Sequence, residues 1–175
     1  ISKLAGEELV KGFEKTYRSF DYTIFRFFNT YGPHQVAQFA ISRFLYNAQH
    51  GLPIVINGSG CQVRSYCFVD DTAKAVASAI SSAEASNEVF NVGNPSQRVS
   101  LNELVDHVIA ALDGRDVEIR RDERFLDGDR VANREIHNRF CDISKIQKFL
   151  GFCPEVSLSD GLQLTLESRS LMKDW

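Results

Sequence analysis

Arginines are the residues of this sequence whose type and setting most clearly indicate ligand chemistry. Arg64 stands in a run with Val63, Phe68 and Val69, whose apolar side chains predict a strand. A guanidinium group in such a strand points to solvent or meets an anion, and its planar donors suit a phosphate or a carboxylate. Arg64 is therefore a candidate anion contact, with a surface or structural ion pair as the alternative.

A second group of arginines lies in the polar segment 121–139, which predicts a long loop. Such a loop inside a compact domain is usually functional or mobile. The segment carries five arginines among five acidic residues. It is either a solvated charged loop or a source of one or two guanidinium groups that clamp a phosphate.

Common catalytic and nucleotide-binding motifs are absent. The sequence contains no GxGxxG, GxxxxGK[ST], HExxH or GxSxG. Gly58-Ser59-Gly60 joins two predicted strands, so we predict a hairpin turn there rather than a phosphate-binding loop. Asp70 and Asp71 form a pair of carboxylates, but their place at a helix start favours capping.

The cysteines and histidines do not predict a metal site. No CxxC pair occurs, and the four histidines are scattered along the chain. The sequence also shows no secretory signal, so we expect reduced thiols and a cytoplasmic protein.

The elements that must position these residues alternate between strands and helices. Apolar residues in 4–20 recur at helical spacing opposite charged ones, and 22–28 is so rich in β-branched and aromatic residues that it predicts a strand buried on both faces. Ser100 and Glu103 make a capping-box pattern. The predicted helices are 4–20, 40–49, 72–83, 101–112, 144–150 and 159–171, and the predicted strands are 22–28, 53–56, 63–69, 88–92 and 117–120. This order predicts an α/β fold.

Length and composition exclude several classes of protein. A chain of 175 residues is one domain or part of a larger one, at about 100–200 residues per domain. No apolar run approaches the roughly 20 residues that a membrane-spanning helix needs. The net charge of −3 provides no general positive field for nucleic acid or anionic lipid. We therefore predict neither a nucleic-acid nor a membrane partner.

The order of several motifs resembles the C-terminal half of the extended short-chain dehydrogenase/reductase family, the NAD-dependent nucleotide-sugar epimerases and dehydratases. The resemblance covers nearly the whole chain. The motifs are SKLAGE at 2–7, FRFFNTYGP at 25–33, GLPI at 51–54, GSGCQVRSYCFVDD at 58–71, FNVGN at 90–94, and DISK at 142–145 leading to LGF at 150–152.

The resemblance implies an α/β fold made of the C-terminal part of a Rossmann-type parallel sheet plus a small mixed α/β substrate-binding lobe. Residues 1–35 and about 63–95 are expected on the Rossmann side, and about 36–62 and 96–175 in the lobe. The N-terminal region with the NAD-binding glycine loop is expected to be absent from this chain, which reads as cut from something longer.

The resemblance also implies roles in chemistry and cofactor binding. Lys3 matches the lysine of the family's Tyr-x-x-x-Lys pair, whose tyrosine would lie before Ile1. In the family this lysine lowers the pKa of the tyrosine phenol and hydrogen-bonds the nicotinamide ribose of NAD. Lys3 is therefore expected to be catalytic and cofactor-binding, while Tyr31 and Pro33 are expected near the nicotinamide, mainly through the shape of their backbone.

The implied ligand is a nucleotide-diphospho-sugar. Many relatives carry an aromatic residue that stacks on the base where this sequence has Asn57. The residues implied to bind the substrate are Asn29 on the diphosphate or glycosyl side, Arg64 on the diphosphate, Tyr66 on the ribose or base, and Arg124, Arg130 or Arg139 as a second phosphate partner.

The function implied is that of the substrate-binding half of an NAD-dependent nucleotide-sugar epimerase or dehydratase that acts by transient oxidation of the sugar. The chain alone is expected to be inactive, because the tyrosine and the glycine loop are not in it. The alternative is a non-catalytic module that binds a nucleotide sugar or a protein. Relatives commonly dimerise through the helix that carries the lysine, which implies a homodimer through 4–20.

Overall fold

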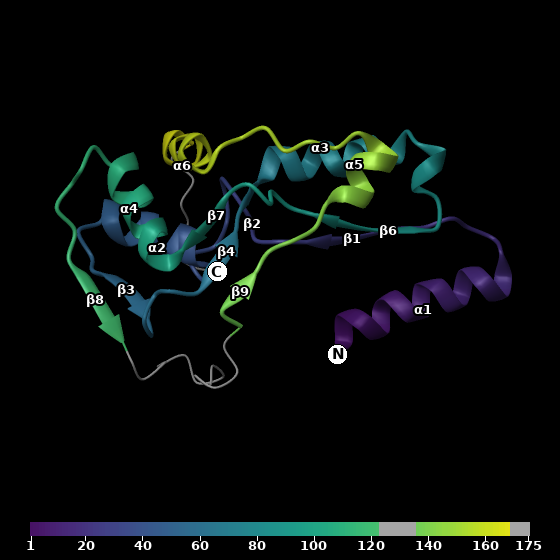
Figure 1. The fold of residues 1–175 in the computed structure, drawn as a ribbon, viewed down its shortest axis with the longest axis horizontal. Helices are drawn as coiled ribbons and strands as arrows, with labels where there is room; N and C mark the ends of the chain where they lie inside the picture. The colour runs from purple at the N-terminus through teal and green to yellow at the C-terminus, as the bar shows by residue number, and fades with distance from the viewer. Residues whose placement is uncertain (123–135, 169–175) are drawn as a thin grey trace.

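The computed structural model describes residues 1–122 and 136–168, and it has the expected alternation of helices and strands (Figure 1). The helices are α1 Ser2–Tyr17, α2 Ala40–Gln49, α3 Val69–Ile80, the short 3-10 helix η1 Ala83–Ala85, α4 Leu101–Ala111, α5 Ser144–Leu150 and α6 Leu158–Glu167. The strands are β1 Thr23–Phe27, β2 Thr30–Tyr31, β3 Ile54–Asn57, β4 Val63–Ser65, β5 Cys67–Phe68, β6 Glu88–Val92, β7 Arg98–Ser100, β8 Ile119–Asp122 and β9 Asn138–Arg139.

The strands form small, mostly parallel sheets. β1 pairs with β6, β2 with β5, and β3 with β8, each in parallel. β4 lies between β7, which is antiparallel to it, and β9, which is parallel. In Figure 1 helices α3 and α5 lie on one side of the β1–β6 pair and α1 on the other. Helices α2 and α4 lie beside β3 toward the opposite end of the molecule, and α6 packs against α4.

The hydrophobic interior consists of two clusters. One is built by α2, α4 and α6 against β2, β3 and β5, with Phe44, Leu45, Leu104 and Leu162 at its centre. The other lies between β6, α3 and α5 around Phe90. The small residues Ala75 and Ala79 of α3 face this second cluster, which lets the helix approach the sheet closely.

Local signals in the sequence predict several elements correctly. The hydroxyl of Ser100 accepts a hydrogen bond from the Glu103 amide, and the Glu103 carboxylate accepts one from the Ser100 amide, so the capping box starts α4 as predicted. Gly151 ends α5 in the left-handed conformation, with φ 63°. The predicted strand 88–92 and the predicted helix 144–150 have the observed bounds of β6 and α5.

The predicted hairpin at Gly58–Gly60 is wrong, and the predicted strand 63–69 is interrupted. β4 ends at Ser65 and β5 begins at Cys67, and the two strands join different sheets. β3 and β4 do not pair with each other, so Gly58 and Gly60, with φ 71° and 74°, form a connection between sheets. The break at Tyr66 is set by the different pairing partners on either side of it.

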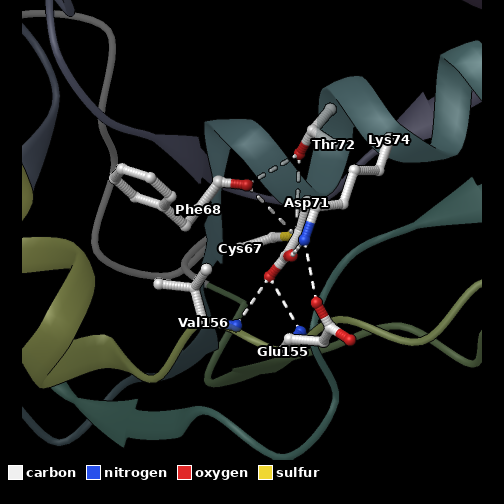
Figure 2. A network of polar contacts seen from close by, with 7 residues as sticks. All are labelled: Cys67, Phe68, Asp71, Thr72, Lys74, Glu155 and Val156. Atoms are coloured by element: carbon white, nitrogen blue, oxygen red, sulfur yellow. Dashed lines mark hydrogen bonds and ion pairs between the residues drawn. The ribbon is translucent and has the colours of Figure 1, made fainter.

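The expectation that Asp70 or Asp71 caps the third helix is also wrong. α3 begins at Val69, and Phe68 occupies the N-cap position without a side-chain hydrogen bond. Asp71 is fully buried and its Oδ2 accepts hydrogen bonds from the backbone amides of Glu155 and Val156, at 3.0 and 2.9 Å (Figure 2). Asp71 therefore fastens the segment before α6 to the start of α3.

The strand expected at 22–28 is not buried on both faces. β1 has partly buried and exposed positions, and the side chain of Phe27 is 53% exposed. Among the described residues β1 pairs with β6 alone, so its second edge has no strand beside it. The side chain of Glu7 in α1 accepts hydrogen bonds from Arg26 of β1 and holds the helix near this strand.

Replacing Gly161 by alanine should destabilise the fold, although alanine is the better helix former. A Cβ atom at this position of α6 would collide with the phenol of Tyr31 and the ring of Phe68. Overpacking of this kind costs about 1–3 kcal/mol. Gly12→Ala is the matched control, because nothing lies within 4 Å of a Cβ there. Chemical denaturation should show a lower free energy of unfolding for G161A alone, and equal values for the two variants would contradict this packing.

Candidate functional site

A cavity of about 310 Å³ lies between β2, α2, β4 and β9. Its described lining residues include three arginines but no aspartate or glutamate. Guanidinium groups gathered at one cavity favour an anionic ligand. The polar residues of the described wall are Asn29, Thr30, Tyr31, Gln35, Gln38, Arg43, Asn57, Gln62, Arg64, Tyr66 and Arg139.

Arg64 and Arg139 form the centre of this positive wall. They are direct partners in the parallel register of β4 and β9. The guanidinium of Arg64 donates hydrogen bonds to the backbone carbonyls of Val63, at 2.9 Å, and His137, at 3.2 Å. Directly opposed residues of neighbouring strands project from the same face of the sheet. Both guanidinium groups can therefore reach one anion.

Asn29 joins the same wall from the end of β1. Its backbone has φ 40°, in the left-handed region that asparagine tolerates better than most residues. Its side-chain Nδ2 donates to the carbonyl of Ser65, at 2.8 Å, and its Oδ1 accepts from Nη2 of Arg139, at 3.4 Å. The structure thus brings together Asn29 from the connection between β1 and β2, Arg64 from β4 and Arg139 from β9.

The two tyrosines expected at the site lie side by side, with an edge-to-face contact between their rings. Tyr66 is buried and lines the cavity. The phenol of Tyr31 points into the core, where it donates a hydrogen bond to the carbonyl of Leu158, and burial raises its pKa. The side chain of Tyr31 therefore supports the fold. That the backbone of this segment lies near the nicotinamide of the cofactor stays a prediction.

The stability of the fold should fall as the pH rises from about 10 to 12, and Tyr66→Phe should reduce this dependence. Burial raises the pKa of Tyr66 to about 12, against the lowering effect of Arg64 and Arg139. In the unfolded chain the phenol ionises near pH 10, so above that pH deprotonation favours unfolding. The effect is up to about 1.4 kcal/mol per pH unit.

Urea denaturation at pH 9, 10, 11 and 12 would measure this dependence for the original chain and for Y66F. Cys67, whose pKa burial raises to about 11, contributes equally in both proteins and cancels in the comparison. Equal slopes for the two proteins would contradict a buried, neutral Tyr66.

The remaining predicted site residues lie outside the cavity wall or outside the described part of the chain. Lys3 is exposed on the first turn of α1. Figure 1 places the N-terminus of α1 toward the end of β1 from which the chain continues to β2. Pro33 is partly buried after β2. Arg124 and Arg130 fall within 123–135, which lies outside the described residues.

Several residues of the cavity wall have no counterpart in the sequence predictions, and Arg43 and Gln35 are two of them. Arg43 lies in α2 between the buried Ser42 and Phe44, a position from which an arginine can reach the interior. Gln35 accepts a hydrogen bond from the hydroxyl of Ser42, at 2.6 Å, and donates one to the carbonyl of Thr30, at 2.8 Å. An arginine flanked by core positions of an amphipathic helix was the signal that could have identified Arg43.

In the described part of the chain, no three histidine, cysteine, aspartate or glutamate side chains come together in a way that could hold a metal ion. None of its helices has the length and apolar character needed to cross a bilayer. The four cysteines are free, with Cys61 and Cys153 exposed and Cys67 and Cys141 buried.

Comparison with known families identifies the chain. The sequence profile described as "NAD dependent epimerase/dehydratase family" matches residues 1–93. The chain belongs to this family. Among the curated members of the NAD-dependent epimerase/dehydratase family, the dTDP-glucose 4,6-dehydratase of Neisseria gonorrhoeae is 30% identical over 172 residues, which are 95% of this chain and 48% of the relative. The uncharacterized UDP-glucose epimerase YtcB of Bacillus subtilis is 29% identical over 162 residues, 93% of this chain and 48% of the relative.

Solved structures of the epimerase/dehydratase family share the fold. The UDP-glucose 4-epimerase of Thermotoga maritima, in a structure with UDP-glucose, has a TM-score of 0.81 at 27% identity, over 95% of this chain and 50% of that one. The UDP-glucuronic acid 4-epimerase of Bacillus cereus, with UDP-glucuronic acid and NAD, has a TM-score of 0.83 at 26% identity over the same shares. These neighbours confirm the Rossmann-type α/β fold class. The chain spans about half the length of the relatives it matches.

Proposed function

We propose that this chain holds the diphosphate of a nucleotide sugar, as the substrate-binding half of an NAD-dependent nucleotide-sugar epimerase or dehydratase. The observation that carries the proposal is the pairing of Arg64 with Arg139 across β4 and β9, at a cavity that three arginines line. Two guanidinium groups side by side match the two charged groups of a diphosphate. Tyr66 and Asn57 line the same cavity and are proposed as contacts of the nucleoside.

The relatives support this choice of ligand. The solved structures of the Thermotoga maritima and Bacillus cereus epimerases contain UDP-glucose and UDP-glucuronic acid, respectively. We also propose a division of the chain into two parts. Residues 1–35 and about 63–95 belong to the Rossmann side, and about 36–62 and 96–175 form the substrate-binding lobe.

The free thiols of the chain support a cytoplasmic location.

The residues of this chain fit only part of an NAD site. The ammonium of Lys3 is exposed at the start of α1 and is available to hydrogen-bond a ribose. The phenol of Tyr31 is turned into the core, and the sequence has no GxGxxG loop to hold a pyrophosphate at a helix N-terminus. In an enzyme of this family NAD accepts a hydride from a sugar carbon. The proposed part of this chain is to hold the sugar nucleotide, with Lys3 as the catalytic lysine.

Calorimetric titration with UDP and with uridine tests the proposed ligand. We expect saturable binding of UDP and at least tenfold weaker binding of uridine, which has the same base and ribose but no phosphate. The affinity for UDP should also fall as salt is raised, because charged contacts are screened. Equal affinities for UDP and uridine, or no binding of UDP, would remove the basis of the proposal.

A turnover assay separates the substrate-binding half from an independent enzyme. Incubation of the chain with NAD and UDP-glucose should produce neither NADH nor a changed sugar nucleotide, while UDP binding is retained. The reason is that the family's tyrosine and glycine loop are not among these 175 residues. Turnover by this chain would contradict its assignment as a binding half.

We also propose that the apolar face of α1 forms a homodimer. No residue of this helix is buried, and Leu9, Phe13 and Tyr17 are each more than half exposed, with the rings of Phe13 and Tyr17 stacked. Sedimentation velocity should show a dimer for the original chain and a monomer for Phe13→Glu. Lys15→Glu, which places the same carboxylate on the exposed polar face and also removes a positive charge, should remain dimeric. A Phe13→Glu variant that stays dimeric would exclude this face as the interface.

A further inference from the structure

We propose that Asn29 is a positioning residue, which holds the guanidinium of Arg139 at the cavity wall and acts on the bound anion through it. The inference rests on the proposed binding of a diphosphate and refines it, since a role in direct substrate contact was expected for Asn29 from the sequence.

Both ends of the Asn29 amide are engaged within the protein. The donor, Nδ2, bonds the carbonyl of Ser65 at the end of β4, at 2.8 Å. The acceptor, Oδ1, receives the hydrogen bond from Nη2 of Arg139 on β9, at 3.4 Å. The bond to a backbone carbonyl fixes the orientation of the amide, and this orientation turns its oxygen toward the guanidinium. The side chain therefore links two strands that carry the positive wall.

The two arginines of the wall are held in different ways. Arg64 donates to the carbonyls of Val63 and His137, so the main chain of β4 and of the segment before β9 anchors its guanidinium. Arg139 is exposed on a strand of two residues, and the hydrogen-bond partner of its guanidinium among the described residues is Asn29. A long, exposed side chain loses much rotamer entropy when it binds a ligand. A partner that restrains it beforehand reduces that loss.

The backbone of Asn29 explains why asparagine suits this position. Its φ of 40° is in the left-handed region, and its carbonyl accepts a hydrogen bond from the amide of Cys67, at 3.2 Å. Glycine would keep this conformation without the amide. Aspartate would set a carboxylate against the Ser65 carbonyl and would neutralise Arg139. These two substitutions separate the role of the amide from that of the backbone.

A double-mutant cycle with UDP as the probe tests the inference. We expect Asn29→Gly to weaken UDP binding about three- to tenfold and Arg139→Ala to weaken it more. The double variant should bind as weakly as Arg139→Ala alone, because the amide has nothing left to position. Losses that multiply in the double variant would show that Asn29 contacts the ligand independently and would overturn the inference.

A measurement without ligand keeps the inference testable if UDP does not bind, in which case the proposed function fails. Arginine side-chain NMR, with the Arg139 signal assigned from Arg139→Lys, reports rotation about its Cζ–Nε bond. Rotation should be faster in Asn29→Gly than in the original chain, while the Arg64 signal, anchored by the main chain, should be unchanged. Equal rotation of Arg139 in the two proteins would overturn the positioning role, and thermal unfolding would confirm that both are folded.

Discussion

Removal of both central guanidinium groups, in the double variant Arg64→Ala/Arg139→Ala, should reduce the affinity for UDP by at least a hundredfold. A hydrogen bond to a charged group contributes about 1.5–3 kcal/mol, and about 1.4 kcal/mol corresponds to a tenfold change in affinity. The two residues are register partners on β4 and β9, and we propose that each bonds one phosphate of a diphosphate. Calorimetric titration at low salt would measure the loss.

The control for this variant is Arg120→Ala. Arg120 is exposed on β8 and forms an ion pair with Glu118, outside the cavity. Its removal changes the net charge of the chain in the same direction but should leave UDP binding within about twofold. The conservative pair Arg64→Lys/Arg139→Lys should have intermediate affinity, because lysine keeps the charge and loses the planar pair of donors. If the double alanine variant binds UDP as tightly as Arg120→Ala does, the anion site lies elsewhere.

Asp71→Ala should lower the free energy of unfolding by about 3 kcal/mol, which is the size expected when one partner of a buried charged contact is removed. The carboxylate is fully buried and accepts the backbone amides of Glu155 and Val156 (Figure 2). The ammonium of Lys74 lies 3.6 Å from its other oxygen. The substitution leaves two backbone donors without their acceptor and frees the segment that leads into α6.

Asp70→Ala is the matched control, because Asp70 is the exposed neighbour of Asp71 in the same first turn of α3. Its loss should cost less than about 1 kcal/mol, the size of a helix-dipole contribution at an exposed site. Urea denaturation followed by circular dichroism would compare the two variants. Equal destabilisation would mean that Asp71 acts as a helix-start charge and that its bonds to 155–156 contribute little.

Some residues of the proposed anion site could be predicted from residue types and local patterns, and others could not. The strand around Arg64 is readable from its neighbours in sequence, and this made Arg64 a candidate from the start. The sequence could not show that Arg139, among the arginines of the predicted loop, lies beside Arg64. This position depends on the pairing of β9 with β4. Arg43 was missed because its helix pattern predicts an amphipathic element without showing that the cavity lies beside it.

Residue types and short-range spacing were enough to predict the α/β class, the family and most of the local elements, such as the capping box of α4, strand β6 and the glycine stop of α5. These features depend on residues a few positions apart, whose spacing and caps act within one element. The break at Tyr66, the burial of Asp71 and the meeting of Asn29, Arg64 and Arg139 depend on contacts between distant parts of the chain. The partners of Asp71 are 84 and 85 positions away in the sequence. Contacts over such separations are selected by the packing of whole elements, which no local pattern records.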